Sequence, residues 1–164
     1  MKKQKTTNAL RMITAAKLPH EAIEYDAGEV GDNFGEKIAE EIGLLSKEQF
    51  FKTLVAKGDK NGIMVACIPC NHEVDLKKLA KVSGNKKAEM IHVKDLLALT
   101  GYVRGSVSPI GMKKKYPTYL SDTALDKSEI IISGGVCGLA VKMSPENIQK
   151  MTDCKFEDII TKGE

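Results

Sequence analysis

The sequence predicts an α/β fold with mixed strand connectivity, within a single domain that spans residues 1–164. Short β-prone apolar runs alternate with segments of helical periodicity along the chain. A turn rich in hairpin-forming residues at 58–62 joins two of these runs, so the predicted sheet is not purely parallel. With 164 residues and 42% hydrophobic content, the chain is long enough for one core and too short for two comfortable ones.

The first part of the chain is predicted to contain two helices and a short strand. Leu10 and Ile13 recur at helical spacing behind residues with capping oxygens, which predicts a helix at 8–16. The segment 20–25 alternates as a short strand. Apolar side chains return every four residues at 34–42, so a second helix is expected there.

The middle of the chain is predicted to form the hairpin and two further helices. The β-rich segment 50–55 precedes the turn, and the apolar run 63–68 follows it. Asp75 can cap a helix that runs to Val82, with its leucines inward and its lysines outward. A strand is then expected at 88–91 and a helix at 94–99.

The last part is predicted to consist mainly of strands, at 118–120, 129–133 and 139–143. Ser144 and Pro145 begin a final helix, because proline is favoured in the first helical turn. The segment 156–160 fits either a closing strand or a helix.

Charge and hydropathy point to a cytoplasmic protein without a membrane span. Charged residues make up 29% of the chain with both signs interspersed, and no window of eighteen residues is apolar. The net charge of +3 is too small for a non-specific DNA-binding protein. A basic patch on one face could still bind RNA phosphates.

The cysteines and histidines do not form a familiar catalytic or metal motif. Cys67 and Cys70 have Cys-x-x-Cys spacing, but no second ligand pair for zinc exists, and the first lies in an apolar run. Buried thiols are therefore predicted in place of a metal or redox pair. The chain lacks a Gly-x-Ser-x-Gly elbow, and its three histidines suggest no catalytic triad. Neither a metal nor a cofactor is expected.

Two features remain as candidates for chemistry. A lysine inside a β-rich run is costly unless it faces a cleft or pairs with an anion, so Lys52 marks a candidate cleft; an edge strand facing solvent is the alternative. The loop at 101–115 carries three glycines, one proline and four cations. Its backbone N–H groups could bind an anion, although its spacing alone favours an ordinary connection with solvated lysines.

Five segments of the chain, in order, resemble the YbaK/EbsC family of aminoacyl-tRNA deacylases, which are related to the editing domain of bacterial prolyl-tRNA synthetases. They are Asn33-Phe34-Gly35, Phe51-Lys52-Thr53-Leu54, the lysine-rich segment 75–81, the loop with Gly101-Tyr102, Gly105, Ser108-Pro109 and Gly111, and Ser133-Gly134-Gly135 with Gly138-Leu139.

This resemblance implies a mixed, curved, barrel-like sheet surrounded by helices, and deacylation of mischarged tRNA in trans, with Cys-tRNA(Pro) as the first expected substrate. It also implies that Lys52 holds the substrate carbonyl or the adenosine end, and that the Gly105 N–H stabilises the oxyanion. The implied substrate-binding residues are Tyr25, Phe34, Thr53, Ser106 and Ser133. From their charge, Arg104 and Lys113 to Lys115, beside further lysines in the segments 77–81 and 86–87, are expected to supply cations for the tRNA acceptor stem, with Arg104, Lys113 and Lys114 as the predicted tRNA-binding residues.

Two departures from the family pattern leave alternatives open. Ser106 replaces a glycine, and Ala140 stands where several cysteinyl-specific members carry aspartate. A deacylase that prefers Ala-tRNA(Pro) and a binding module that has lost turnover are both kept, and a thiol redox protein is a distant third. The implied partners are mischarged tRNA(Pro) and, as a candidate, prolyl-tRNA synthetase; neither DNA nor a membrane is expected.

Overall fold

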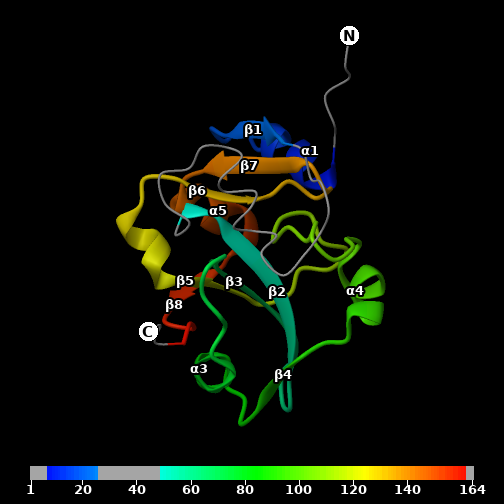
Figure 1. The fold of residues 1–164 in the computed structure, drawn as a ribbon, viewed down its shortest axis with the longest axis vertical. Coiled ribbons are helices and arrows are strands. Elements are labelled where there is room, and N and C mark those ends of the chain that lie inside the picture. The colour runs from blue at the N-terminus through cyan, green and yellow to red at the C-terminus, as the bar shows by residue number, and fades with distance from the viewer. Residues whose placement is uncertain (1–6, 26–48, 162–164) are drawn as a thin grey trace.

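The computed structural model describes residues 7–25 and 49–161. Figure 1 shows the arrangement of their helices and strands. These elements are α1 (Asn8–Ala15), β1 (Glu21–Glu24), β2 (Phe51–Gly58), β3 (Gly62–Pro69), α3 (Leu76–Val82), β4 (Ala88–Met90), α4 (Val93–Thr100), β5 (Thr118–Ser121), the 3-10 helix η2 (Asp122–Asp126), β6 (Ile130–Ser133), β7 (Leu139–Met143), α5 (Pro145–Thr152) and β8 (Lys155–Glu157).

Most elements agree with the sequence-based expectations to within a few residues. The closing segment is a strand, β8, because it pairs in parallel with β5. The short helix η2 was not predicted; its N-cap is Ser121, whose hydroxyl accepts from the Thr123 N–H. The helix expected at 34–42 lies outside the described residues.

The described strands form two sheets. One has the order β1-β7-β6 and is antiparallel throughout. The other has the order β4-β2-β3-β5-β8, and it combines antiparallel pairs around the β2–β3 hairpin with parallel pairs at β5 and β8. The predicted mixed α/β fold is therefore confirmed.

The expected barrel-like sheet is not found. A single parallel bridge between Phe50 and Ile131 links the two sheets, and the described strands do not close into a barrel. Figure 1 shows β2 running from the three-stranded sheet toward β4 at the opposite end of the molecule. This bridge does not extend into a ladder, so the described strands form two separate sheets.

Side-chain caps fix the N-terminal ends of α1 and α3. The Thr7 hydroxyl accepts from the Leu10 N–H and donates to the Gly134 carbonyl, which ties α1 to the turn between β6 and β7. Asp75 accepts from the N–H groups of Lys77 and Lys78 at the start of α3, as predicted.

No helix in the described part of the chain combines the length and the apolar character needed to cross a bilayer.

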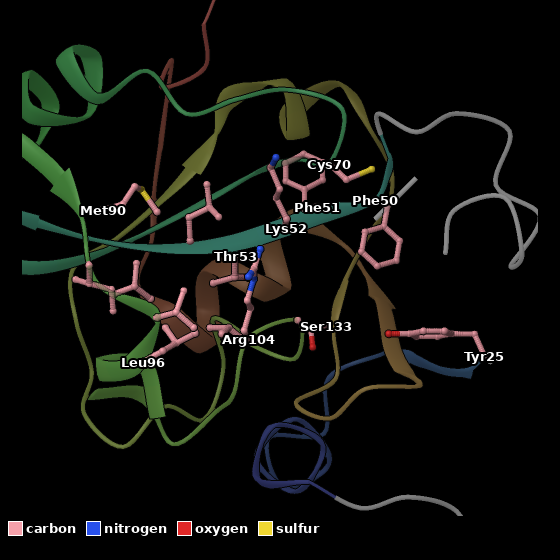
Figure 2. A pocket seen from close by; sticks show the side chains of 16 residues that line it. Tyr25, Phe50, Phe51, Lys52, Thr53, Cys70, Met90, Leu96, Arg104 and Ser133 are labelled. Atoms are coloured by element: carbon pink, nitrogen blue, oxygen red, sulfur yellow. The ribbon is translucent and has the colours of Figure 1, made fainter. Parts of the chain in front are cut away.

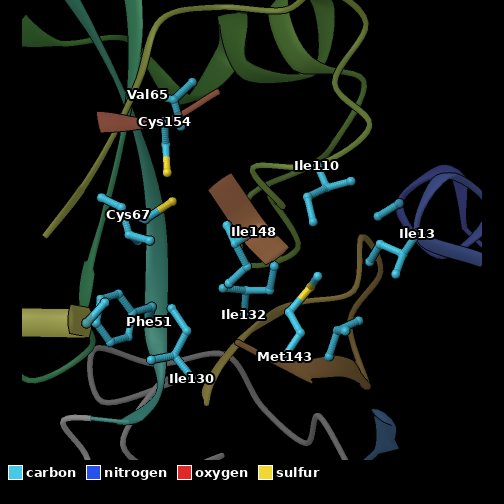
Figure 3. Packing of buried hydrophobic residues seen from close by; sticks show 14 of the residues in the cluster. Ile13, Phe51, Val65, Cys67, Ile110, Ile130, Ile132, Met143, Ile148 and Cys154 are labelled. Atoms are coloured by element: carbon cyan, nitrogen blue, oxygen red, sulfur yellow. The ribbon is translucent and has the colours of Figure 1, made fainter. Parts of the chain in front are cut away.

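The largest hydrophobic core lies between the two sheets. Figure 3 shows its side chains meeting from Phe51 and Cys67 on the five-stranded sheet to Ile13 on α1. Ile132 of β6 and Met143 of β7 are fully buried in this cluster. Because side chains alternate along a strand, the residues next to these core positions on β6 and β7 face the other side of the three-stranded sheet.

Candidate functional site

A pocket of about 500 Å³ follows β2 along its free edge. Figure 2 shows Tyr25 and Phe50 at one end of the pocket and Met90 and Leu96 at the other. The volume is in the range typical of small-molecule sites. The bridge to the three-stranded sheet at Phe50 brings residues from both sheets to the pocket.

Six residues singled out from the sequence meet in this pocket although they come from distant parts of the chain. They are Tyr25, Lys52, Thr53, Arg104, Gly105 and Ser133. Phe34 lies outside the described residues. Ser106, Lys113 and Lys114 are described but do not line the pocket.

Gly105 occupies the tip of a tight turn. The Ser106 N–H donates to the Val103 carbonyl at 3.0 Å, and Gly105 has a φ of +85° at the third position of this turn. A type II turn needs positive φ at that position, which glycine adopts without strain. The hydrogen bond of the turn uses the Ser106 N–H, so the Gly105 N–H is not consumed by it.

Ser106 is part of the scaffold beneath the pocket. This residue is 2% exposed, and its hydroxyl donates to the Val103 carbonyl at 2.9 Å. Its φ is not positive, so replacing a family glycine with serine causes no backbone strain here. The Ser106 carbonyl accepts from the Ser133 hydroxyl at 2.8 Å, and that hydroxyl accepts from the Gly135 N–H at 3.1 Å. Ser133 therefore fastens the glycine loop to the three-stranded sheet.

The pocket is cationic. Lys52 and Arg104 are the charged residues among its described lining, which includes no carboxylate. Neither has an ion-pair partner within the described segments. Figure 2 shows their side chains on opposite sides of β2. Two unpaired cations in one cavity favour an anionic ligand such as a phosphate group.

The lysines outside the pocket differ in their surroundings. Lys113 and Lys114 are exposed, and the Lys113 N–H anchors the loop by donating to the Thr100 carbonyl at 3.0 Å. Lys115 forms an ion pair with Asp153. Lys78 is 3.0 Å from an oxygen of Asp158, so it is already paired within the chain.

The four cysteines are thiols that differ in burial: Cys67 and Cys154 are buried, and Cys70 and Cys137 are half-buried. Burial raises the pKa of Cys67 to about 12, and its sulfur lies 3.5 Å from the Thr53 hydroxyl. Cys67 is thus the buried thiol that the sequence predicted. Cys70 is half-buried and lines the pocket, so the same expectation does not fully describe it. No cluster of metal-binding side chains occurs within the described residues.

Ala140 lies behind the pocket wall. It is fully buried, packs in a cluster with Phe50 and Ile131, and is the register partner of Ser133. An aspartate at this position would have to be accommodated among apolar neighbours, at a desolvation cost.

The remaining lining residues were not predicted as a site, because sequence patterns indicate only a strand, a helix or an apolar loop position there. They are Phe50, Phe51, Leu54, Val55, Cys70, Met90, Ile91, Val93, Leu96 and Val107. Met90 and Val93 are 41% and 58% exposed, so the end of the pocket beside β4 and α4 is an open apolar rim.

Comparisons with known proteins agree with this picture. The aminoacyl-tRNA editing domain family matches residues 33–151. The chain is 50% identical, over 98% of its length and 97% of the relative, to a candidate Cys-tRNA(Pro)/Cys-tRNA(Cys) deacylase named EbsC from Enterococcus faecalis. It is 26% identical to a proline–tRNA ligase from Brachyspira hyodysenteriae, over 54% of this chain and 15% of the ligase.

The fold is also found in crystal structures. One is of a candidate trans-editing enzyme for prolyl tRNA synthetase, with a TM-score of 0.78 and 20% identity over 96% of this chain and 99% of that chain. Another is of a hypothetical protein, with a TM-score of 0.83 and 18% identity over 94% of this chain and all of that chain (100%). At these identities the likeness concerns the fold alone.

Proposed function

Because the chain belongs to the aminoacyl-tRNA editing domain family, we propose that it hydrolyses the ester bond of mischarged aminoacyl-tRNA in trans. The observation that carries this proposal is the meeting of Lys52 and Gly105 in one pocket that has a second cation and no described carboxylate. The match and the shared core also support one editing domain over residues 1–164.

In the proposed reaction the pocket positions the ester and stabilises charge. Attack on the carbonyl carbon breaks its bond to the ribose oxygen, and the amino acid and the ribose hydroxyl are released. The Gly105 N–H would donate to the oxyanion, and Lys52 would hold the carbonyl or the adenosine end. The attacking oxygen would come from water, with the substrate's own groups assisting.

The proposed substrate is Cys-tRNA(Pro), with Ala-tRNA(Pro) second. The deacylase named EbsC supports cysteine, since it is half identical to this chain over nearly its whole length. The buried Ala140 shows that no carboxylate is needed at that position for the described fold. A small, uncharged aminoacyl group fits a wall of this kind.

We assign the remaining residues to the tRNA end. Tyr25 would stack on the terminal adenine, because aromatic rings bind bases without sequence preference. Arg104 would pair with a phosphate, and the exposed Lys113 and Lys114 would contact the acceptor stem. Prolyl-tRNA synthetase is the proposed partner, and the cytoplasm, where its tRNA is charged, is the proposed location.

The test measures release of radiolabelled amino acid from Cys-tRNA(Pro) and Ala-tRNA(Pro). Lys52→Ala should slow release by roughly two to three orders of magnitude, comparable to losing an oxyanion donor. Lys57→Ala is the matched control, because Lys57 lies on the same strand, is exposed and does not line the pocket.

Three outcomes separate the alternatives. Faster release from one tRNA establishes the preferred aminoacyl group. Equal rates for wild type and Lys52→Ala would remove Lys52 from the mechanism. No release from either substrate, with tRNA binding intact, would identify a binding module.

A further inference from the structure

We propose that the open edge of β2 at Thr53 holds the aminoacyl group through the protein backbone, with the Thr53 N–H and C=O as the contacting groups. This inference rests on the proposed function and deepens it. It assigns a role to Thr53 that does not depend on its side chain.

The register of the β2–β3 hairpin shows which edge each residue of β2 faces. The Cys70 N–H donates to the Phe50 carbonyl at 2.7 Å, so this opposed pair exchanges hydrogen bonds across the hairpin. Such pairs alternate along an antiparallel ladder, and Thr53 lies an odd number of residues from Phe50. The backbone N–H and C=O of Thr53 therefore point away from β3.

Two other hydrogen bonds agree with this alternation. The Val55 carbonyl accepts from the Ile91 N–H at 3.3 Å, on the edge of β2 away from β3. The N–H of Val65, the register partner of Val55, donates to the Pro117 carbonyl at 2.9 Å, away from β2. Thr53 and Val55 thus direct their backbone groups to the same outer edge.

Within residues 7–25 and 49–161, no strand covers this outer edge beside Thr53. β4 pairs with β2 only at residues 56–58, and the bridge between Phe50 and Ile131 lies on the other side of Thr53. No strand in the described part of the chain pairs with the edge between them. Thr53 lines the pocket, and its hydroxyl is 3.5 Å from the buried sulfur of Cys67.

The chemistry of this edge fits the end of the substrate common to all aminoacyl esters. An uncovered strand edge offers one hydrogen-bond donor and one acceptor together, and both need partners once a bound ligand displaces water from them. The Thr53 N–H would donate to the ester carbonyl oxygen, and the Thr53 carbonyl would accept from the α-ammonium group. Figure 2 shows Thr53 beside Arg104, which precedes Gly105 in the chain. The edge of β2 and the glycine loop therefore line the same part of the pocket.

The test replaces the Lys52–Thr53 peptide bond by an ester, which removes the Thr53 N–H and keeps the side chain. The probe is 3′-amino-3′-deoxyadenosine carrying alanine through a stable amide. Its dissociation constant should rise roughly ten-fold or more, as for loss of a hydrogen bond in a shielded site. Thr53→Val, which removes only the hydroxyl, should change it much less.

A second backbone ester, placed in β3, is the matched control. Replacing the Val65–Ala66 peptide bond removes an N–H that pairs with Leu54 within the hairpin and lies outside the pocket lining. This ester should lower the melting temperature and leave probe affinity unchanged. The Thr53 ester should leave the melting temperature unchanged and weaken binding of the probe.

The α-ammonium contact has its own probe. A propionyl amide of the same nucleoside lacks the amino group and should bind the wild type more weakly than the alanyl probe. Equal affinity of the wild type and the Thr53 ester for the alanyl probe would overturn the proposal. Deacylation by the wild type is measured separately, so a failure of the proposed hydrolysis is distinguishable from a failure at Thr53.

Discussion

Gly105 has two roles, one in the conformation of its turn and one in the proposed contact with the oxyanion. Its φ of +85° places it in the left-handed region, where a side chain is strained. The same glycine lies in the pocket lining, so a substitution would disturb both the turn and the proposed oxyanion contact.

Gly105→Ala should lower the free energy of unfolding by about 1–2 kcal/mol and reduce deacylation. Urea unfolding and the release assay measure the two effects. Gly62→Ala is the control, because Gly62 has a φ of +73° in the hairpin turn with no neighbouring atom within 4 Å of an added Cβ. The control should share the stability loss and retain activity; a similar loss of activity in both would count against a specific role of Gly105.

At the scale of elements, the β2–β3 hairpin is held in place by the segment that follows α3. The Asn85 side-chain oxygen accepts from the N–H groups of Lys60 and Asn61 at 2.9 and 2.8 Å. The Asn85 amide donates to the Ser83 hydroxyl at 2.7 Å. A Cβ on Gly58 would lie 2.2 Å from Asn85, so the two segments are in direct contact. This contact orients the far end of the strand that carries the pocket.

Asn85→Ala should destabilise the protein by about 1–3 kcal/mol, because it leaves two backbone donors of the hairpin turn without their acceptor. Chemical denaturation measures the change. Hydrogen exchange at Lys60 and Asn61 should also accelerate. Lys86→Ala is a suitable control, since Lys86 is exposed and only its backbone N–H takes part, donating to Asp59. Unchanged exchange in Asn85→Ala would show that other contacts hold the turn.

At the scale of the whole molecule, burial keeps several weak acids protonated. It raises the pKa of Cys67 from 9.0 to about 12 and that of Tyr102 from 10.0 to about 12. Their pKa values are higher in the folded state than in the unfolded one. Above pH 9 the unfolded chain therefore loses protons that the folded protein keeps.

The free energy of unfolding should consequently fall as the pH rises from about 9 to 12, and be independent of these groups below that window. Denaturant titrations at a series of pH values measure the slope. Cys67→Ala should flatten this slope, because it removes one of the two groups whose pKa burial raises. A slope that is the same in wild type and Cys67→Ala would contradict the assignment to Cys67.

Local patterns were sufficient to predict much of this molecule. The hairpin and the cap at Asp75 depend on residues close together in sequence, whose propensities and periodicity determine the local conformation. The resemblance also singled out Tyr25, Lys52, Arg104 and Gly105, and the structure brings these residues to one pocket.

Other features depend on contacts between distant segments. Among the described strands, the bridge at Phe50 alone joins the two sheets, and periodicity along the sequence does not predict such a long-range link. Ser106 and Ser133 were both predicted as substrate-binding residues. In the structure Ser106 lies beneath the pocket, whereas Ser133 lines its wall. Among the described strands, the edge of β2 at Thr53 has no pairing strand because β4 pairs with β2 only from Ala56 to Gly58. Residue patterns thus predicted most of the elements and the family. Which strand edges are covered became visible in the folded protein alone, because coverage depends on strand partners far apart along the chain.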